Sequence, residues 1–195
     1  MARNTKPQTI RITGGRLKGR RLATPPGLDV RPTSERAREA LFNRLAHGGF
    51  GADGGPILPG ARVADLYCGT GALGLEALSR GAACATFVDQ SLGSLDIART
   101  NATSLQTADS CVFLQATLPA GLPKGPFDLV FLDPPYAVHL AQATLDAVVS
   151  AGVLASSAIV CVETGKDTLM ETPAALTLLD RRQYGAAAIW LFRAD

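Results

Sequence analysis

Four consecutive residues, Asp133, Pro134, Pro135 and Tyr136, have the groups needed to hold an amino group of a nucleic-acid base. They follow the apolar run 127–132, and an aspartate at the end of a buried strand is costly to desolvate unless something pairs with it. Proline has no backbone N–H and keeps the preceding residue extended. The Asp133 carboxylate and the Pro134 carbonyl would therefore be neighbouring acceptors for the two hydrogens of an amino group, with Tyr136 stacked on the base. The alternative is a plain Asp-Pro-Pro turn with Tyr136 in the core.

A glycine loop earlier in the chain is typical of a nucleotide-binding crossover. Gly69, Gly71 and Gly74 form G-x-G-x-x-G in the stretch VADLYCGTGALGLEALSRGA, and glycine allows tight turns and a close approach of the backbone to a ligand. The pattern also occurs in NAD- and FAD-binding proteins, and many matches are only tight turns. Asp65, at the end of the preceding strand, would repel a pyrophosphate and suits a cation, such as an adenosyl sulfonium with its amino group.

Two later strand ends carry polar residues that suit an adenosine. Asp89 ends the second predicted strand, where an acid can accept hydrogen bonds from both ribose hydroxyls. The alternative is an N-cap for the helix that starts near Ser91, although Ser91 itself could be that cap. Gln115 and Ala116 follow the third strand, where the amide could bind adenine or could simply be exposed in a loop. Asp89 does not separate NAD from S-adenosylmethionine, because both contain an adenosine ribose.

The elements that must position these residues lie after residue 60, where strand-like and helix-like segments alternate. Strands separated by helical crossovers predict a doubly wound, mostly parallel α/β sheet. In such a sheet the fourth strand lies beside the first, so Asp133 and the glycine loop should face one crevice. The last two strands are too close for a crossover and predict an antiparallel hairpin around Tyr184 and Gly185. The predicted strands lie near 62–66, 84–88, 110–114, 127–132, 158–163, 176–181 and 187–193, and the predicted helices near 72–80, 91–104 and 139–150.

The N-terminal part of the chain is strongly basic. Residues 1–44 hold eleven Lys and Arg residues against three acids, a net charge of +8, while the remaining residues have a net charge of −6. This asymmetry favours contact with nucleic acid over a merely solvated cationic arm. The stretch TIRITGGRLKGRRLATP predicts a β-hairpin with Gly14 and Gly15 in its turn, and RPTSERAREALFNRLAHGG predicts a helix that ends before Gly48. The basic residues expected to contact RNA are Arg11, Arg16, Lys18, Arg20, Arg21, Arg31 and Arg38.

Length and composition predict one substantial domain with an extension. The expected parts are a basic extension over 1–48, a Gly/Pro-rich connector over 49–60 and a catalytic domain over 61–195. No window approaches the ~18 uninterrupted apolar residues of a membrane span, and the N-terminus lacks the apolar core of a secretory signal. Four scattered cysteines and two histidines argue against a zinc site, a disulfide framework and metal chemistry. We expect a monomer in the reducing cytoplasm.

Taken together, the motifs resemble one known family. DLYCGTGALGLEALSRGA followed by DPPY looks like a class I, S-adenosylmethionine-dependent methyltransferase that acts on amino groups. The stretch RITGGRLKGRRLATPPGLDVRPTSERAREALFNRL is similar to one branch, the RsmD-like 16S ribosomal RNA guanine-N2 methyltransferases. The resemblance covers nearly the whole chain. It implies a seven-stranded Rossmann-like fold and methylation of a guanine in small-subunit RNA, within a 30S subunit or an assembly intermediate.

The resemblance also implies roles for individual residues, without a metal. The glycine-loop residues would bind the methionine end of the cofactor, Asp89 its ribose and Gln115 its adenine. Gln115 departs from the family, which often has Asn or Asp there. The expected cofactor contacts are Asp65, Tyr67, Gly69, Gly71, Asp89, Gln115 and Ala116, and the expected catalytic residues are Asp133, Pro134, Pro135 and Tyr136.

Three other functions are compatible with parts of the sequence. An adenine-N6 methyltransferase acting on DNA would use the same amino-group holder. An NAD-linked oxidoreductase would use the glycine loop and Asp89, but it should carry a catalytic Tyr-x-x-x-Lys, Cys or His beyond the fourth strand, and no convincing candidate is present. A non-catalytic RNA-binding assembly factor would use the basic arm, but it would not need an unbroken glycine loop together with the acceptor motif.

Overall fold

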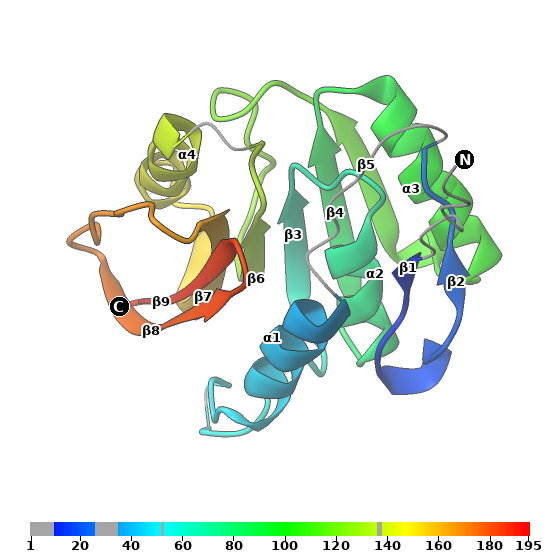
Figure 1. Ribbon diagram of the computed structural model, residues 1–195, viewed down its shortest axis with the longest axis horizontal. Coiled ribbons are helices and arrows are strands. Elements are labelled where there is room, and N and C mark those ends of the chain that lie inside the picture. Colours follow the sequence, from blue (N-terminus) through cyan, green and yellow to red (C-terminus); the bar gives the residue numbers. More distant parts are fainter. Residues whose placement is uncertain (1–9, 26–34, 52, 136–137) are drawn as a thin grey trace, which may run out of the picture.

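The computed structural model describes residues 10–25, 35–51, 53–135 and 138–195. The strands of the main sheet are β3 (Arg62–Leu66), β4 (Cys84–Asp89), β5 (Cys111–Gln115), β6 (Phe127–Leu132), β7 (Leu154–Gly165), β8 (Leu176–Tyr184) and β9 (Ala187–Ala194). They form one seven-stranded sheet in the order β5-β4-β3-β6-β7-β9-β8 (Figure 1). The strands from β5 to β7 are parallel, and β9 is antiparallel to both neighbours. The predicted doubly wound sheet with its antiparallel C-terminal hairpin is confirmed.

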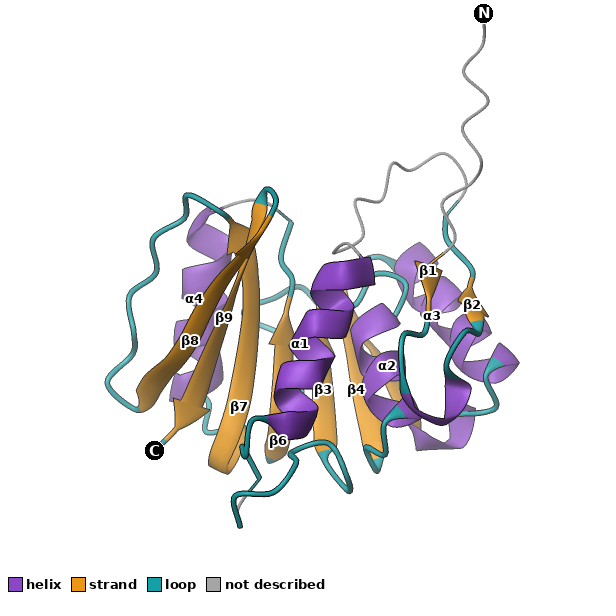
Figure 2. Ribbon diagram, turned by 60° about the horizontal axis from the view of Figure 1, so that its bottom comes forward, coloured by secondary structure: helices purple, strands orange, loops and turns teal. Residues whose placement is uncertain are grey.

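Helices cover both faces of this sheet (Figure 2). The helices are α1 (Glu35–His47), α2 (Ala72–Ser79), α3 (Leu92–Ser104) and α4 (Val138–Ser150), with a short 3-10 turn, η2 (Ala108–Ser110). The first three pack on one face, in a core that includes Phe42 and Phe131, and α4 packs on the other face. Along β6, Leu129 belongs to the first core and Val130 to the second. Burial on both faces explains why β6 is almost continuously apolar.

The lengths of two strands differ from the prediction. The strand predicted near 158–163 begins at Leu154 and ends at Gly165, and β8 continues to Tyr184 instead of ending near 181. β8 pairs with β9 along its length, and β7 pairs with β9 from Ile159 to Gly165. The early start of β7 is a pairing with β6, where Leu154 lies opposite Phe127. Short-range patterns do not reveal these pairings. Residues 117–126 form turns and no helix, as their proline and glycine content predicts. In the described part of the chain, no helix is long and apolar enough to cross a membrane.

The N-terminal hairpin is confirmed, but its turn is longer than Gly14-Gly15. Strands β1 (Ile10–Arg11) and β2 (Arg21–Leu22) are antiparallel, and the 3-10 turn η1 (Gly15–Leu17) lies between them. The loop docks on the end of α2. The Ser79 hydroxyl donates to the Gly14 carbonyl at 2.6 Å and accepts from the Leu17 N–H at 2.9 Å. A Cβ on Gly15 would lie 2.0 Å from the Ser79 carbonyl oxygen, so only glycine allows this approach.

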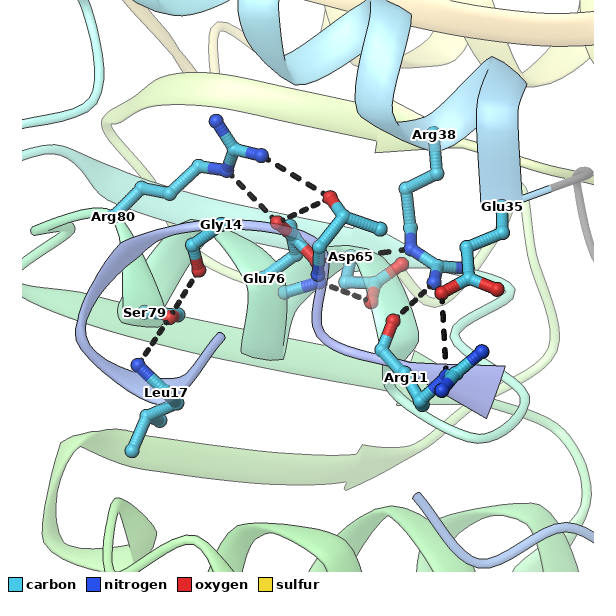
Figure 3. A network of polar contacts seen from close by, with 11 residues as sticks. Arg11, Gly14, Leu17, Glu35, Arg38, Asp65, Glu76, Ser79 and Arg80 are labelled. Atoms are coloured by element: carbon cyan, nitrogen blue, oxygen red, sulfur yellow. Dashed lines mark hydrogen bonds and ion pairs between the residues drawn. The ribbon is translucent and has the colours of Figure 1, made fainter. Parts of the chain in front are cut away.

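Glu76 of α2 is the fully buried centre of a polar network that joins α1, α2 and the hairpin (Figure 3). Its carboxylate accepts hydrogen bonds from the Thr13 N–H at 2.7 Å and the Thr13 hydroxyl at 2.8 Å. It also accepts from Arg80 Nε at 2.8 Å and lies 3.7 Å from Arg38 Nε of α1. Burial lowers the pKa of Arg38, and Glu76 opposes that shift. A buried carboxylate is tolerated here because two guanidinium groups and two hydrogen-bond donors surround it.

Replacing Glu76 tests how much this network contributes to stability. Glu76→Gln should lower the free energy of unfolding by about 3–5 kcal/mol, because it leaves the buried guanidinium group of Arg38 and the partly buried one of Arg80 without their anion. Urea unfolding measures this change. The control is Glu39→Gln, an exposed acid of α1, which should change stability by less than ~0.5 kcal/mol. Equal effects of the two substitutions would contradict a central role for Glu76.

Candidate active site

The carboxyl ends of β3 and β6 meet at the centre of the sheet. The two strands are parallel neighbours, with Leu66 opposite Leu132, and the Asp133 N–H donates to the Leu66 carbonyl at 3.4 Å. From here the chain after β3 continues to β4 on one side of the pair, and the chain after β6 continues to β7 on the other side. Such a switch point is where open α/β sheets bind their ligands. The structure thus brings Asp133 beside the strand that leads into the glycine loop, as the sequence predicts.

The glycines of the loop serve different purposes. Gly69 has a φ of 52°, and a Cβ added there would have no atom within 4 Å, so this glycine borders open space. Gly71 is the left-handed N-cap of α2, with a φ of 77°. Gly74 allows close packing, because a Cβ there would lie 2.4 Å from the Phe87 ring. The open side at Gly69 fits a ligand that lies against the backbone of the loop.

Asp65 lies behind this loop and is almost fully buried. Its Oδ2 atom accepts a hydrogen bond from the Gly74 N–H at 2.8 Å, which fastens the first turn of α2 to β3. Burial raises the pKa of Asp65 to about 7, nearby Asp89 adds to the shift, and the Gly74 N–H opposes it. Its observed role is to hold the loop and to add negative charge, and a direct cofactor contact stays a prediction.

Asp89, at the end of β4, is bound to the glycine loop. One carboxylate oxygen accepts from the Gly69 N–H at 3.0 Å, and the other accepts from the Ser91 N–H at 2.8 Å. The N-cap of α3 is Ser91, whose hydroxyl accepts from the Ser94 N–H at 3.2 Å. Asp89 is half-buried, and each carboxylate oxygen has a second lone pair. The geometry therefore leaves it able to accept ribose hydroxyls.

The remaining predicted cofactor residues lie at the carboxyl ends of β3 and β5. Gln115 lies opposite Asp89 in the β4–β5 pairing, and the Ala116 N–H donates to the Asp89 carbonyl at 3.1 Å. The exposed Gln115 amide donates to the Gln90 carbonyl at 3.2 Å. Tyr67 has a left-handed φ of 64°, and its hydroxyl lies 2.7 Å from the Thr144 hydroxyl of α4. Its side chain is thus tied to α4, while its backbone begins the glycine loop.

Asp133 lies in an acidic environment. It is half-buried, Pro134 is buried and Pro135 is exposed, whereas Tyr136 lies outside the described residues. Burial raises the pKa of Asp133 well above its usual range, and the charges of Glu163 and Asp65 add to the shift. The sequence analysis did not include Glu163 in the site. Its position at the end of the strand predicted near 158–163 is a signal that could have indicated it.

Comparison with known proteins identifies the family. Residues 10–193 match the family described as Conserved hypothetical protein 95. The Ribosomal RNA small subunit methyltransferase D of Escherichia coli K12 is 34% identical over 95% of this chain and 90% of its own length. The chain belongs to the RsmD-like family of ribosomal RNA methyltransferases. The corresponding protein of Haemophilus influenzae is 31% identical over 94% of this chain and 93% of its own.

Solved structures agree with the RsmD-like assignment. The structure of the yhhF protein from Escherichia coli has a TM-score of 0.82 and 31% identity, and the match covers 96% of this chain and 99% of that one. The structure of HI0767 from Haemophilus influenzae has a TM-score of 0.78 and 29% identity, with the same coverage. Likeness over nearly the whole of each chain includes the N-terminal hairpin and α1 as well as the main sheet.

The basic residues of the RsmD-like N-terminal part differ in exposure. Those exposed on the hairpin are Arg11, Arg16, Lys18, Arg20 and Arg21. Two of them also make contacts within the protein, because Arg11 lies 3.5 Å from Glu35 and Arg20 donates to the Ser104 carbonyl at 2.7 Å. Arg31 lies outside the described residues. The five exposed cations all belong to the hairpin, and their contact with RNA stays a prediction.

The prediction that Arg38 contacts RNA is wrong. Only 2% of this residue is exposed, and its guanidinium group pairs with Glu76 and donates to the Arg11 carbonyl (Figure 3). Arg38 shares the inner side of α1 with Leu41 and Leu45. Its charge is used inside the protein to hold α1 against the hairpin.

The raised pKa of Asp65 predicts a pH-dependent stability. Because the folded-state pKa lies above the ordinary value of 3.8, the stability from protonated Asp65 is lost as the pH rises towards and through 7. Asp65→Asn keeps an acceptor for Gly74 and removes the charge. Its unfolding free energy relative to wild type should therefore increase between pH 5 and pH 8, by at most about 3 kcal/mol.

Urea unfolding of both proteins at the two pH values measures this change. Because the charge of Asp65 adds to the pKa shift of Asp133, the comparison measures the loss of the Asp65 charge together with its effect on Asp133. The control is Asp109→Asn at an exposed position of η2, whose difference from wild type should not change with pH. A constant difference for Asp65→Asn would show that Asp65 is ionised throughout.

Proposed function

We propose that this protein transfers a methyl group from S-adenosylmethionine to the exocyclic N2 amino group of a guanine in 16S ribosomal RNA. The observation that carries the proposal is the pairing of β3 with β6, which sets the Asp133 acceptors beside the strand that enters the glycine loop. Membership of the RsmD-like family supports methylation of ribosomal RNA. The names of the relatives in Escherichia coli and Haemophilus influenzae support the small subunit as the substrate.

The charge of the crevice supports a cationic methyl donor. Asp65, Asp89 and Asp133 lie at the carboxyl ends of neighbouring strands, and Glu163 lies near the end of β7. Partly buried carboxylates attract a cation and repel a pyrophosphate, which favours S-adenosylmethionine over NAD. When bound, S-adenosylmethionine supplies a methyl group on positively charged sulfur. The open side of Gly69 accommodates its chain, and Asp89 accepts its ribose hydroxyls.

The acceptors at the end of β6 hold the amino group to be methylated. The Asp133 carboxylate and the Pro134 carbonyl accept its two hydrogens, which directs the nitrogen lone pair into the crevice and makes the nitrogen more nucleophilic. Donors that enter the site favour the ionised form of Asp133 and lower its raised pKa. Asp133 or water then takes the proton that the amino group loses. Tyr136 stacks on the base, which is presented from a loop or flipped out of a helix.

Labelling tests the reaction directly. The protein is incubated with radiolabelled S-adenosylmethionine and 30S particles from a strain that lacks this enzyme. We expect label in one guanine of 16S RNA, recovered as N2-methylguanosine after digestion to nucleosides. Label in adenine or DNA, or no label in any of these substrates, would overturn the proposed function.

In the same assay, Asp133→Ala should abolish methylation while S-adenosylmethionine binding, measured by calorimetry, stays near that of wild type. The matched control is Asp128→Ala at the other end of β6, where the carboxylate bonds to Arg62 at 2.9 and 3.0 Å, away from the crevice. The control should retain methylation. Loss of both binding and methylation in Asp133→Ala would mean that this acid is structural.

The basic hairpin should provide phosphate contacts that do not depend on sequence. Arg16→Ala combined with Lys18→Ala removes two exposed charges from the hairpin loop. Because each lost phosphate contact lowers the salt dependence of binding, the slope of log K against log salt should flatten by about 1–2 units. Filter binding to 16S RNA at several salt concentrations measures the slope.

The control for the hairpin variant removes two other exposed charges, Lys124→Ala and Lys166→Ala, outside the hairpin. We expect this double variant to keep the wild-type slope. If both double variants flatten the slope equally, the effect comes from net charge and not from a hairpin contact.

A further inference from the structure

Glu163 of β7 lies next to the end of β6, which Asp133 follows directly. Strands β6 and β7 are neighbours in the sheet (Figure 1). They are parallel, with Phe131 opposite Cys161 and Leu132 opposite Val162. The next pair in this register is Asp133 and Glu163. Since neighbouring strands are about 4.8 Å apart, the two carboxylates can reach the same small ligand.

The two acids also share one face of the sheet. Phe131 and Cys161 belong to the core under α1, α2 and α3, and side chains two residues further along a strand point to the same side. This is also the side of Asp65, which lies opposite Phe131. The electrostatic effect of Glu163 on Asp133 agrees with this placement. Glu163 is half-buried, so it is not sealed in the core.

Two neighbouring carboxylates suit the donor pattern of guanine. In guanine, the N2 amino group lies next to N1–H, so the edge to be methylated presents donors side by side. In adenine and cytosine, the ring nitrogen next to the amino group is an acceptor. A carboxylate accepts hydrogen bonds and cannot donate when ionised, so it would meet a lone pair on either of these bases.

We propose that Glu163 accepts the N1–H of the target guanine while Asp133 and Pro134 hold its N2 amino group. Glu163 is then a specificity-determining residue that selects guanine over other bases with an amino group. This inference rests on the proposed function. It adds that N1–H is the group by which the enzyme distinguishes guanine from other bases with an amino group. Sites built to bond a polar group strongly reject analogues that lack it, because their own buried polar groups are left unpaired.

The test removes the N1–H of the target base. 30S particles are reconstituted with 16S RNA that carries 2-aminopurine at the guanine found by labelling, because 2-aminopurine keeps the N2 amino group and has an acceptor at N1. 2-aminopurine also lacks the 6-carbonyl oxygen of guanine, so a Glu163 variant is needed to assign the effect to N1. Wild-type enzyme should methylate this base with a kcat/KM about 10- to 100-fold below that for guanine, the loss expected when a charged hydrogen bond is removed. Equal rates on the two bases would overturn the proposal without any protein variant.

Glu163→Gln then tests the side chain. The amide has a donor for N1 of 2-aminopurine, so the ratio of kcat/KM for guanine to that for 2-aminopurine should fall at least about tenfold relative to wild type. The control is Glu171→Gln at an exposed position, which should keep the wild-type ratio. An unchanged ratio would exclude a contact between Glu163 and N1. If both kcat/KM values also fall by the same factor, Glu163 is merely structural.

The outcomes separate this inference from the proposed function. If wild-type enzyme methylates no guanine, the proposed function fails. If it methylates guanine at N2 but does not distinguish 2-aminopurine, the proposed function stands and the role of Glu163 is rejected. Calorimetric binding of S-adenosylmethionine to Glu163→Gln checks that the glycine loop is intact in the variant.

Discussion

The parallel pairing of β3 with β6 is the constraint on which the site depends. With Leu66 opposite Leu132, both chains leave the sheet side by side, one into the glycine loop and the other into Asp133. Their connections diverge to opposite sides of the sheet, and a switch point of this kind is where open α/β sheets bind their ligands. The buried apolar residues of both strands fix this register, because a slip by one residue would turn every side chain to the other face.

The fold keeps two electrostatic tasks apart. Exposed cations are gathered on the N-terminal hairpin, while the crevice is lined by carboxylates whose burial raises the pKa of Asp65 and Asp133. Glu76 connects the two regions, since it binds the hairpin through Thr13 and belongs to α2, the helix that begins at the glycine loop. The basic hairpin and the glycine loop are therefore held in one packed arrangement.

Much of the fold could be predicted because its signals are local. Apolar runs, helix periodicity and turn residues predict the strands, the helices and the C-terminal hairpin. The longer turn of the N-terminal hairpin could not be predicted, because its shape depends on docking against Ser79 of α2. Arg38 was misjudged for a similar reason. A charged residue in a basic helix suggests exposure, and only the distant Glu76 makes its burial tolerable.

The sequence by itself determined the glycine loop and the acids at the strand ends, because these depend on residue type and spacing along the chain. It also predicted that Asp133 and Pro134 accept an amino group. Only the tertiary structure decided that Asp65 is buried behind the loop, that the Tyr67 hydroxyl is tied to α4, and that Glu163 neighbours Asp133. The physical reason is that the charge and role of a carboxylate depend on its loss of water and on its neighbours. Those neighbours come from strands and helices far apart in the chain.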